Sequence, residues 1–248
     1  NSQINLSSVG SLALPESFTS SLSSFLSQIE GAHKDLLTSS YKSSQTLSSA
    51  FRTFWQKVCS NLGILFFDPL TSEAKNLSSD IIHKAIFNYQ EINELLLENS
   101  RSLKQNGFEP QVLIKTDSPL FFLDLNSERK RLVAHDGKFF HGTTAINKEE
   151  LERLILEETS RFTSSALIRP ILQDSFFRTL AYICGPSEFS YWAQIKPLYQ
   201  YFNIAQPMVV PRSNFRLIEP KYKRILEKSG FELKDIAVNR SELLAKRF

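Results

Sequence analysis

One short stretch constrains the fold of this chain more than any other. The apolar run at residues 179–184 is followed at once by Gly185-Pro186 and then by a helical pattern. If Gly185 is the cap and Pro186 the first helical residue, Glu188 falls at the third position, from which its carboxylate can accept the amide hydrogen of the cap. A strand, a glycine turn and a helix start place free backbone amides at the carboxyl end of a sheet, where open α/β folds bind ligands. We therefore expect an α/β domain with a cleft at this turn.

The rest of the chain alternates between strand-like and helix-like patterns. A short apolar run at 64–67 is typical of a buried strand in a parallel sheet, and 111–115, 207–210 and 214–218 are predicted as further strands. Such alternation favours a mostly parallel sheet with helices on both faces. Helices are predicted near 16–30, 46–61, 147–158, 170–177, 219–229 and 239–247. Residues 70–105 are predicted as one long amphipathic helix or as two helices end to end. The helix that begins at Pro186 should kink or restart near Lys196, because Pro197 follows it.

A small antiparallel meander is predicted over 120–141. Its clearest signal is Asp136-Gly137 between two apolar runs, which indicates a tight hairpin turn. We divide the chain into a Ser-rich helical segment at 1–62, an α/β core at 63–218 with the meander inserted at about 111–141, and C-terminal helices at 219–248.

Composition excludes several classes of protein. The net charge of +3 is too small for a nucleic-acid binder, and no apolar run approaches the ~20 residues of a membrane span. Two cysteines form no disulfide framework, and the N-terminus lacks the pattern of a signal peptide. We therefore expect a cytoplasmic protein that contacts neither nucleic acid nor membrane.

Two charged residues near the turn have alternative interpretations. Glu188 either only caps its helix or also holds an ammonium group, such as the amine of an amino acid or of a sugar. Arg169 either pairs with Asp174 or Glu188, or clamps a carboxylate or phosphate with its planar guanidinium group. With Gly185 and with Arg212, which follows the strand predicted at 207–210, they outline the expected cleft.

Other chemistry is weakly indicated. Cys184 has no histidine placed by the sequence to activate it, and the four histidines are scattered, so we expect no metal site. No Walker-type phosphate loop, G-x-G-x-x-G or nucleophile elbow is present.

The same region resembles the family of bacillithiol-biosynthesis cysteine-adding enzymes called BshC. Upstream, residues 62–69 and 107–112 resemble other blocks of that family, and the likeness covers about residues 47–228. The matching residues are Ile168-Arg169-Pro170, Gln173-Asp174, Thr179, Ala181-Tyr182-Ile183, Gly185-Pro186, Glu188, Tyr191-Trp192, Pro207, Val210-Pro211-Arg212 and Phe215.

The resemblance implies a Rossmann-like core and a reaction that joins cysteine to glucosaminyl-malate through an amide, with ATP as a possible cofactor. It implies that Glu188 holds an amine, that Arg169 and Arg212 hold carboxylates or phosphates, and that Tyr191 lines the pocket. Catalytic residues stay unassigned. The predicted substrate-binding set is Arg169, Gln173, Gly185, Pro186, Ser187, Glu188, Tyr191 and Arg212.

The chain also departs from the family pattern. Cys184 stands where a glycine is usual, Ser187 replaces glycine or alanine, and Phe177-Arg178 replaces Leu-Pro, so the fit of substrate at the loop is altered. The family's His-Asp-rich motif would precede residue 1, and its helical coiled-coil arm, which forms a homodimer, would follow residue 248. We therefore expect a fragment of a cysteine ligase that is inactive alone. The alternative is a non-catalytic relative that acts as a small-molecule binding or dimerisation module.

Overall fold

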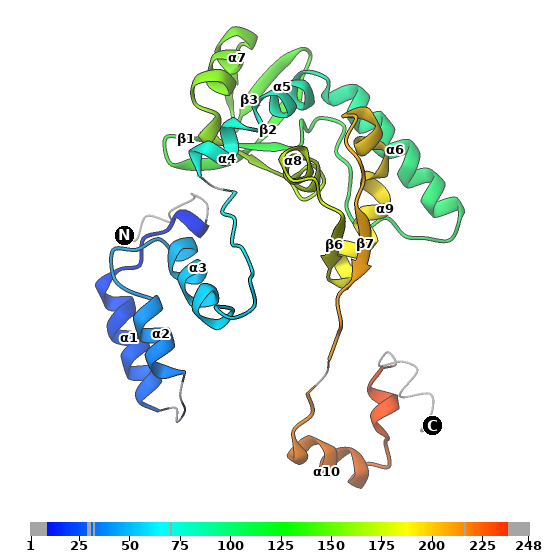
Figure 1. Ribbon diagram of the computed structural model, residues 1–248. Coiled ribbons are helices and arrows are strands. Elements are labelled where there is room, and N and C mark those ends of the chain that lie inside the picture. The colour runs from blue at the N-terminus through cyan, green and yellow to red at the C-terminus, as the bar shows by residue number, and fades with distance from the viewer. Residues whose placement is uncertain (1–8, 29–30, 32, 70, 216, 238–248) are drawn as a thin grey trace. The chain divides into compact units, whose positions relative to one another are not determined.

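The computed structural model describes residues 9–28, 31, 33–69, 71–215 and 217–237 (Figure 1). The chain forms two compact units, Asn1–Val210 and Pro211–Phe248, which are described separately below. The helices of the first unit are η1 (Val9–Ser11), α1 (Glu16–Ser27), α2 (Lys34–Ser40), α3 (Leu47–Val58), α4 (Ser72–Asn76), α5 (Ser79–Phe87), α6 (Tyr89–Gln105), α7 (Lys148–Glu157), η2 (Thr159–Arg161), α8 (Arg169–Phe176) and α9 (Pro186–Tyr201).

The helices predicted near 16–30 and 46–61 correspond to α1 and α3, and α2 between them was not predicted. Helix α2 has only 7 residues, too few to show a helical period in the sequence. The Thr46 side chain caps α3 by accepting the amide hydrogen of Ser49 at 3.3 Å. The amphipathic stretch at 70–105 is neither one helix nor two, but the three successive helices α4, α5 and α6.

The main sheet has five strands, and every neighbouring pair in it is antiparallel. The prediction of a mostly parallel sheet is therefore wrong. Two-residue turns join β1 to β2 and β2 to β3, and such hairpins can only connect antiparallel strands. The predicted Asp136-Gly137 turn is confirmed, with both residues at positive φ (50° and 74°). The strands are β1 (Phe121–Leu125), β2 (Glu128–His135), β3 (Lys138–His141), β4 (Thr144–Ile146) and β5 (Phe162–Ser164), in the order β4-β3-β2-β1-β5.

Residues 111–115 form no strand, because side chains take the hydrogen bonds that a sheet would provide. The Gln194 side chain is fully buried; its Oε1 accepts the amide hydrogens of Gln111 and Val112, each at 2.9 Å, and its Nε2 donates to the Val112 carbonyl at 3.0 Å. Further along, buried Asn93 donates to the carbonyls of residues 115, 116 and 118. The expected strand is thus fixed to α9 and α6 as an irregular segment. Residues 64–67 also form no strand, and Leu65 among them is 95% exposed.

A separate pair of strands, β6 (Ala181–Cys184) and β7 (Met208–Pro211), flanks α9. The Met208 amide donates to the Leu180 carbonyl, and the Cys184 thiol donates to the Val210 carbonyl. These contacts join the two strands in the same order along the chain, which is the order of a parallel pair. The predicted strand, glycine turn and helix therefore form a β–α–β unit, the element from which Rossmann-like domains are built.

One face of the five-stranded sheet and the helices share a single apolar core. Alternate residues of the strands are buried on that face, as expected for an antiparallel sheet with one covered side. Helices α6 and α9 pack against each other and carry much of the rest. Core residues include Phe121, Leu123, Leu132, Ala134, Phe139, Ile146, Ile92, Leu96, Ile171, Trp192, Ile195 and Leu198.

The second unit contains α10 (Pro220–Lys228) and η3 (Leu233–Ala237). Helix α10 confirms the helix predicted near 219–229, whereas the helix predicted at 239–247 lies outside the described residues. The described residues of 214–218 form no strand, contrary to the prediction. In the part of the chain that the structure describes, no helix is long and apolar enough to cross a membrane.

Candidate functional site

The predicted turn brings Arg169, at the start of α8, against the first turn of α9. The Nη2 atom of Arg169 donates to the Tyr182 hydroxyl at 2.9 Å, to Glu188 Oε1 at 3.3 Å and to the Tyr191 hydroxyl at 3.5 Å. The Tyr182 hydroxyl donates to the same Glu188 oxygen at 3.0 Å. Three residues of the predicted set, Arg169, Glu188 and Tyr191, therefore meet in one network with Tyr182.

Gly185, Pro186 and Glu188 take the predicted capping positions. Gly185 is the cap residue with ordinary extended backbone (φ −73°, ψ 167°), and Pro186 is the first helical residue. Glu188 Oε2 accepts the Gly185 amide hydrogen at 3.1 Å. The carboxylate therefore serves both the helix cap and the ion pair with Arg169, so both structural interpretations of Glu188 and Arg169 hold. Whether Glu188 also holds an amine stays a prediction.

Burial and hydrogen bonds shift the pKa values of two members of the network, Arg169 and Tyr182. Burial opposes the charge of Arg169, but its hydrogen bonds to Tyr182 and Tyr191 outweigh this and raise its pKa. Burial also raises the pKa of Tyr182, with a partly offsetting effect from Arg169. Arg169 is thus a permanent cation whose orientation is set by three oxygen acceptors.

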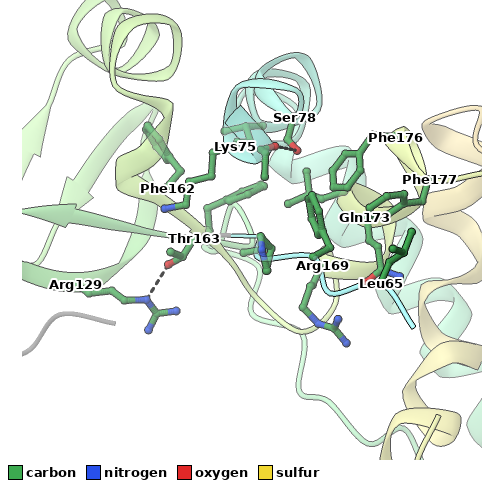
Figure 2. A pocket seen from close by; sticks show the side chains of 17 residues that line it. Leu65, Lys75, Ser78, Arg129, Phe162, Thr163, Arg169, Gln173, Phe176 and Phe177 are labelled. Carbon is green, nitrogen blue, oxygen red and sulfur yellow. Dashed lines mark hydrogen bonds between the residues drawn. The ribbon is translucent and has the colours of Figure 1, made fainter. Parts of the chain in front are cut away.

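A cavity of about 700 Å³ lies beside the network, at the β5 edge of the sheet (Figure 2). Arg169 and Gln173 of the predicted set line it, together with aromatic side chains that include Phe67, Phe162 and Phe176. The Arg169 side chain as a whole is 41% exposed, so a ligand can reach it. Its Nε and Nη1 atoms have no hydrogen-bond partner among the described residues, which leaves donors for a carboxylate or phosphate.

Gly185, Pro186 and Ser187 do not line this cavity. Pro186 and Ser187 are exposed on the first turn of α9, and Gly185 is buried beneath it. Arg212 is exposed and belongs to the second unit, so its predicted role at this site stays a prediction. Asp174, from the same motif as Gln173, is instead a buried structural acceptor, because it binds the hydroxyls of Tyr199 and Thr179 at 2.6 and 2.5 Å.

Sequence reasoning missed two cations that line the cavity, Lys75 from α4 and Arg129 from β2. The sequence around Arg129 is a charged cluster, Arg129-Lys130-Arg131, and such clusters usually form solvated faces. The alternation of side chains along β2 is a usable signal, because it places Arg129 and Lys130 on opposite faces of the sheet and so shows that the cluster does not lie on one face. No signal in the sequence brings Lys75 to the same place. Among the described residues, no group of three or more His, Cys, Asp or Glu side chains is arranged to hold a metal ion.

A β–α–β unit together with an antiparallel sheet and packed helices defines a domain that mixes α and β structure, with an arginine-lined cavity at the edge of the sheet. Comparison with known families agrees with this class: residues 1–213 match the family described as "Bacillithiol biosynthesis BshC, N-terminal Rossmann-like domain". The chain belongs to the BshC family.

Curated relatives carry the same name. The chain is 30% identical over 202 residues to "Putative cysteine ligase BshC" of Koribacter versatilis, which covers 82% of this chain and 38% of that protein. Proteins with the same description from Natranaerobius thermophilus and Staphylococcus saprophyticus are 29% and 27% identical, over 78% and 76% of this chain and 36% and 35% of theirs. The chain thus spans little more than a third of the length of these relatives.

Proposed function

We propose that this chain is the Rossmann-like part of an enzyme of bacillithiol biosynthesis that joins the carboxyl group of cysteine to the amine of glucosaminyl-malate. Membership of the BshC family and the description of its relatives as cysteine ligases support this proposal. The observation that carries it is the Arg169 network, because it presents an oriented cation in the wall of a cavity of substrate size.

Amide formation places definite demands on such a site. An amine does not displace a carboxylate oxygen unaided, so the carboxyl group must first be activated, and we propose ATP as the activating substrate. The residues of this chain would bind and orient the substrates. Arg169 would pair with a substrate carboxylate through its unused Nε and Nη1 donors, while Tyr182, Tyr191 and Glu188 hold its side chain in place.

The remaining expectations also belong to this proposal. Arg212 would supply a second cation, and Gln173 a polar group in the cavity wall. The complete protein would be a cytoplasmic homodimer whose dimer contact comes from a coiled-coil arm outside this chain.

The test uses the full-length protein that contains this chain. It is supplied with cysteine, glucosaminyl-malate and ATP, and the amide product is measured by mass. We expect product with the unaltered protein and a loss of about 100-fold in kcat/KM for Arg169→Met. Arg169→Lys should give an intermediate kcat/KM, because lysine restores the positive charge but lacks the planar pair of donors of a guanidinium group. Absence of product with intact protein and verified substrates, together with retained substrate binding, would replace the ligase with the binding-module alternative.

A further inference from the structure

Three aromatic rings beside the Arg169 network are in contact, and we call them the aromatic triplet. The indole of Trp192 on α9 contacts the ring of Tyr182 on β6 and the ring of Tyr199 further along α9. Its ring centroid is 4.6 Å from that of Tyr182, tilted by 40°, and 5.6 Å from that of Tyr199, stacked at 23°. Trp192 is 2% exposed, and its indole nitrogen has no hydrogen-bond partner among the described residues. Packing alone therefore fixes the Trp192 ring, which in turn restrains the ring of Tyr182.

Both ends of the aromatic triplet are bonded to helix α8. At one end the Tyr199 hydroxyl donates to Oδ2 of Asp174 at 2.6 Å, and the Thr179 hydroxyl donates to the other oxygen of this buried carboxylate at 2.5 Å. At the other end the Tyr182 hydroxyl accepts a hydrogen bond from Arg169 Nη2 at 2.9 Å. Arg169 and Asp174 both belong to α8, so these contacts form a closed circuit that leaves the helix at Asp174 and returns to it at Arg169.

The bond to Tyr182 restrains Arg169 more than its other contacts do. Fixing a long arginine side chain costs rotamer entropy, and the side chain is 41% exposed, where an ion pair is weak. Arg169 Nη2 lies 3.3 Å from Glu188 Oε1 and 3.5 Å from the Tyr191 hydroxyl, both farther than the Tyr182 hydroxyl. Burial lowers the pKa of Arg169, and the hydrogen bond to Tyr182 is the largest of the effects that raise it above its ordinary value.

We propose that Trp192 is a positioning residue: it fixes Tyr182, and Tyr182 aims the guanidinium group of Arg169 into the cavity. This inference rests on the proposed function, in which Arg169 pairs with a substrate carboxylate. Trp192 does not line the cavity, so its effect can reach a substrate only through the residues that it contacts. A displacement of about 1 Å can cost about 100-fold in rate, so a ring remote from the substrate can still control the reaction.

A double-mutant cycle in the full-length protein tests this coupling, with kcat/KM for the amide product as the measurement. Trp192→Leu removes the ring and should lower kcat/KM about tenfold, whereas Trp192→Phe keeps a ring and should lower it by less. On an Arg169→Met background, Trp192→Leu should cost less than about twofold, because the residue through which it acts is gone. Losses that multiply in the double variant would overturn the proposal, since Trp192 would then act independently of Arg169.

Phe139→Leu is the matched control. Phe139 is a buried ring of the same apolar core that contacts Phe87 and Tyr89 and lies outside both the cavity lining and the aromatic triplet. We expect it to lower the unfolding midpoint as Trp192→Leu does, since each removes buried aromatic contacts, yet to leave kcat/KM within about twofold. An equal loss of kcat/KM in both variants would overturn the proposal, because a general loosening of the core would then explain it.

A second measurement follows Arg169 without the reaction. Phenylglyoxal modifies guanidinium groups, and peptide mass gives the rate at Arg169. In Trp192→Leu this rate should rise several-fold, because Arg169 loses the restraint of Tyr182 and its pKa falls, whereas Phe139→Leu should leave it unchanged. An unchanged rate in Trp192→Leu would contradict the positioning role. Tyr199→Phe keeps the ring but releases the aromatic triplet from Asp174, and it replaces Trp192→Leu in both measurements if that variant does not fold.

The two proposals fail separately. If no amide product forms but modification of Arg169 is faster in Trp192→Leu, the proposed reaction is wrong and the positioning of Arg169 by Trp192 stands. If product forms and both measurements are the same for Trp192→Leu and the unaltered protein, the positioning role is wrong and the proposed reaction stands.

Discussion

The five-stranded sheet and the helices of the first unit are held together by different kinds of hydrogen bond. On the sheet side, backbone groups of β1, β2 and β5 pair with each other, and most side chains could be exchanged without unpairing them. On the helix side, single side chains do this work: Asp174 joins α8 to α9, Gln194 fixes residues 111–112, and Asn99 reaches from α6 to α9. The difference teaches that stability of the helix side should depend on a few polar residues, whereas that of the sheet side should not.

Asp174→Ala should have the largest effect on stability. It leaves the buried hydroxyl of Tyr199 without its acceptor and removes one of the two acceptors of the half-buried Thr179 hydroxyl, and we expect a loss of about 3 kcal/mol in the free energy of unfolding. Chemical denaturation of the first unit measures it. The control is Asp124→Ala on the sheet side, which is half-buried on β1 and should cost less than about 1 kcal/mol. Equal losses of unfolding free energy in the two variants would contradict the difference between the helix side and the sheet side.

Gln194→Leu should lower the free energy of unfolding by about 2 kcal/mol, the second largest loss. The amides of Gln111 and Val112 lose their acceptor, while the buried side-chain volume is nearly kept. Gln200→Leu, an exposed position on the same helix, is the control and should change stability by less than about 0.5 kcal/mol. Hydrogen exchange should show the loss locally, as faster exchange of the amides at 111 and 112. Unchanged exchange there would contradict the role assigned to Gln194.

Asn99→Ala should cost about 1 kcal/mol, for a reason specific to α9. Pro197 has no amide hydrogen, so the carbonyl of Ala193 one turn earlier lacks its helical donor, and Asn99 Nδ2 donates to it instead at 2.7 Å. This contact accompanies a single helix over Pro186–Tyr201, so the predicted restart near Lys196 is wrong, whereas the alternative of a kink there stays a prediction. In a double-mutant cycle, Asn99→Ala should cost less on a Pro197→Ala background, where the restored amide supplies the bond. Additive losses would remove this explanation.

The smallest effect should appear only at high pH. Burial and then the hydrogen bond to Asp174 raise the pKa of Tyr199 above its ordinary value of 10.0. A raised pKa in the folded state means that the unfolded chain releases the proton first, so the contribution of Tyr199 is complete below about pH 10 and is lost as pH rises above it. The unfolding free energy of the unaltered protein should therefore fall more steeply between about pH 10 and 11 than that of Tyr199→Phe. Parallel slopes would show that Tyr199 titrates normally.

Local patterns predicted the elements whose hydrogen bonds are local. The Asp136-Gly137 hairpin, the helix predicted at 147–158 and the Gly185-Pro186 start of α9 all follow from residues within a few positions of each other. In the second of these, Asn147 caps α7 by accepting the Glu150 amide hydrogen at 2.7 Å. The sequence also placed Arg169 and Glu188 at one cleft, although α8 and β6 lie between them, because both residues belong to one motif. The same reasoning was wrong for apolar runs that it predicted as strands and that do not pair in a sheet. An apolar run such as 111–115 is compatible with a strand, but no local pattern shows that Gln194, some 80 residues later, binds its backbone.

The sequence by itself determined the family, the helix starts, the tight turns and the motif that orients Arg169, because each depends on residue types at short, fixed spacing. Only the tertiary structure decided that the main sheet is antiparallel and that Arg129 and Lys75 line the same cavity as Arg169. Strand partners and cavity walls are chosen by packing between segments far apart in the chain, and the free energy of that packing belongs to no single stretch of sequence.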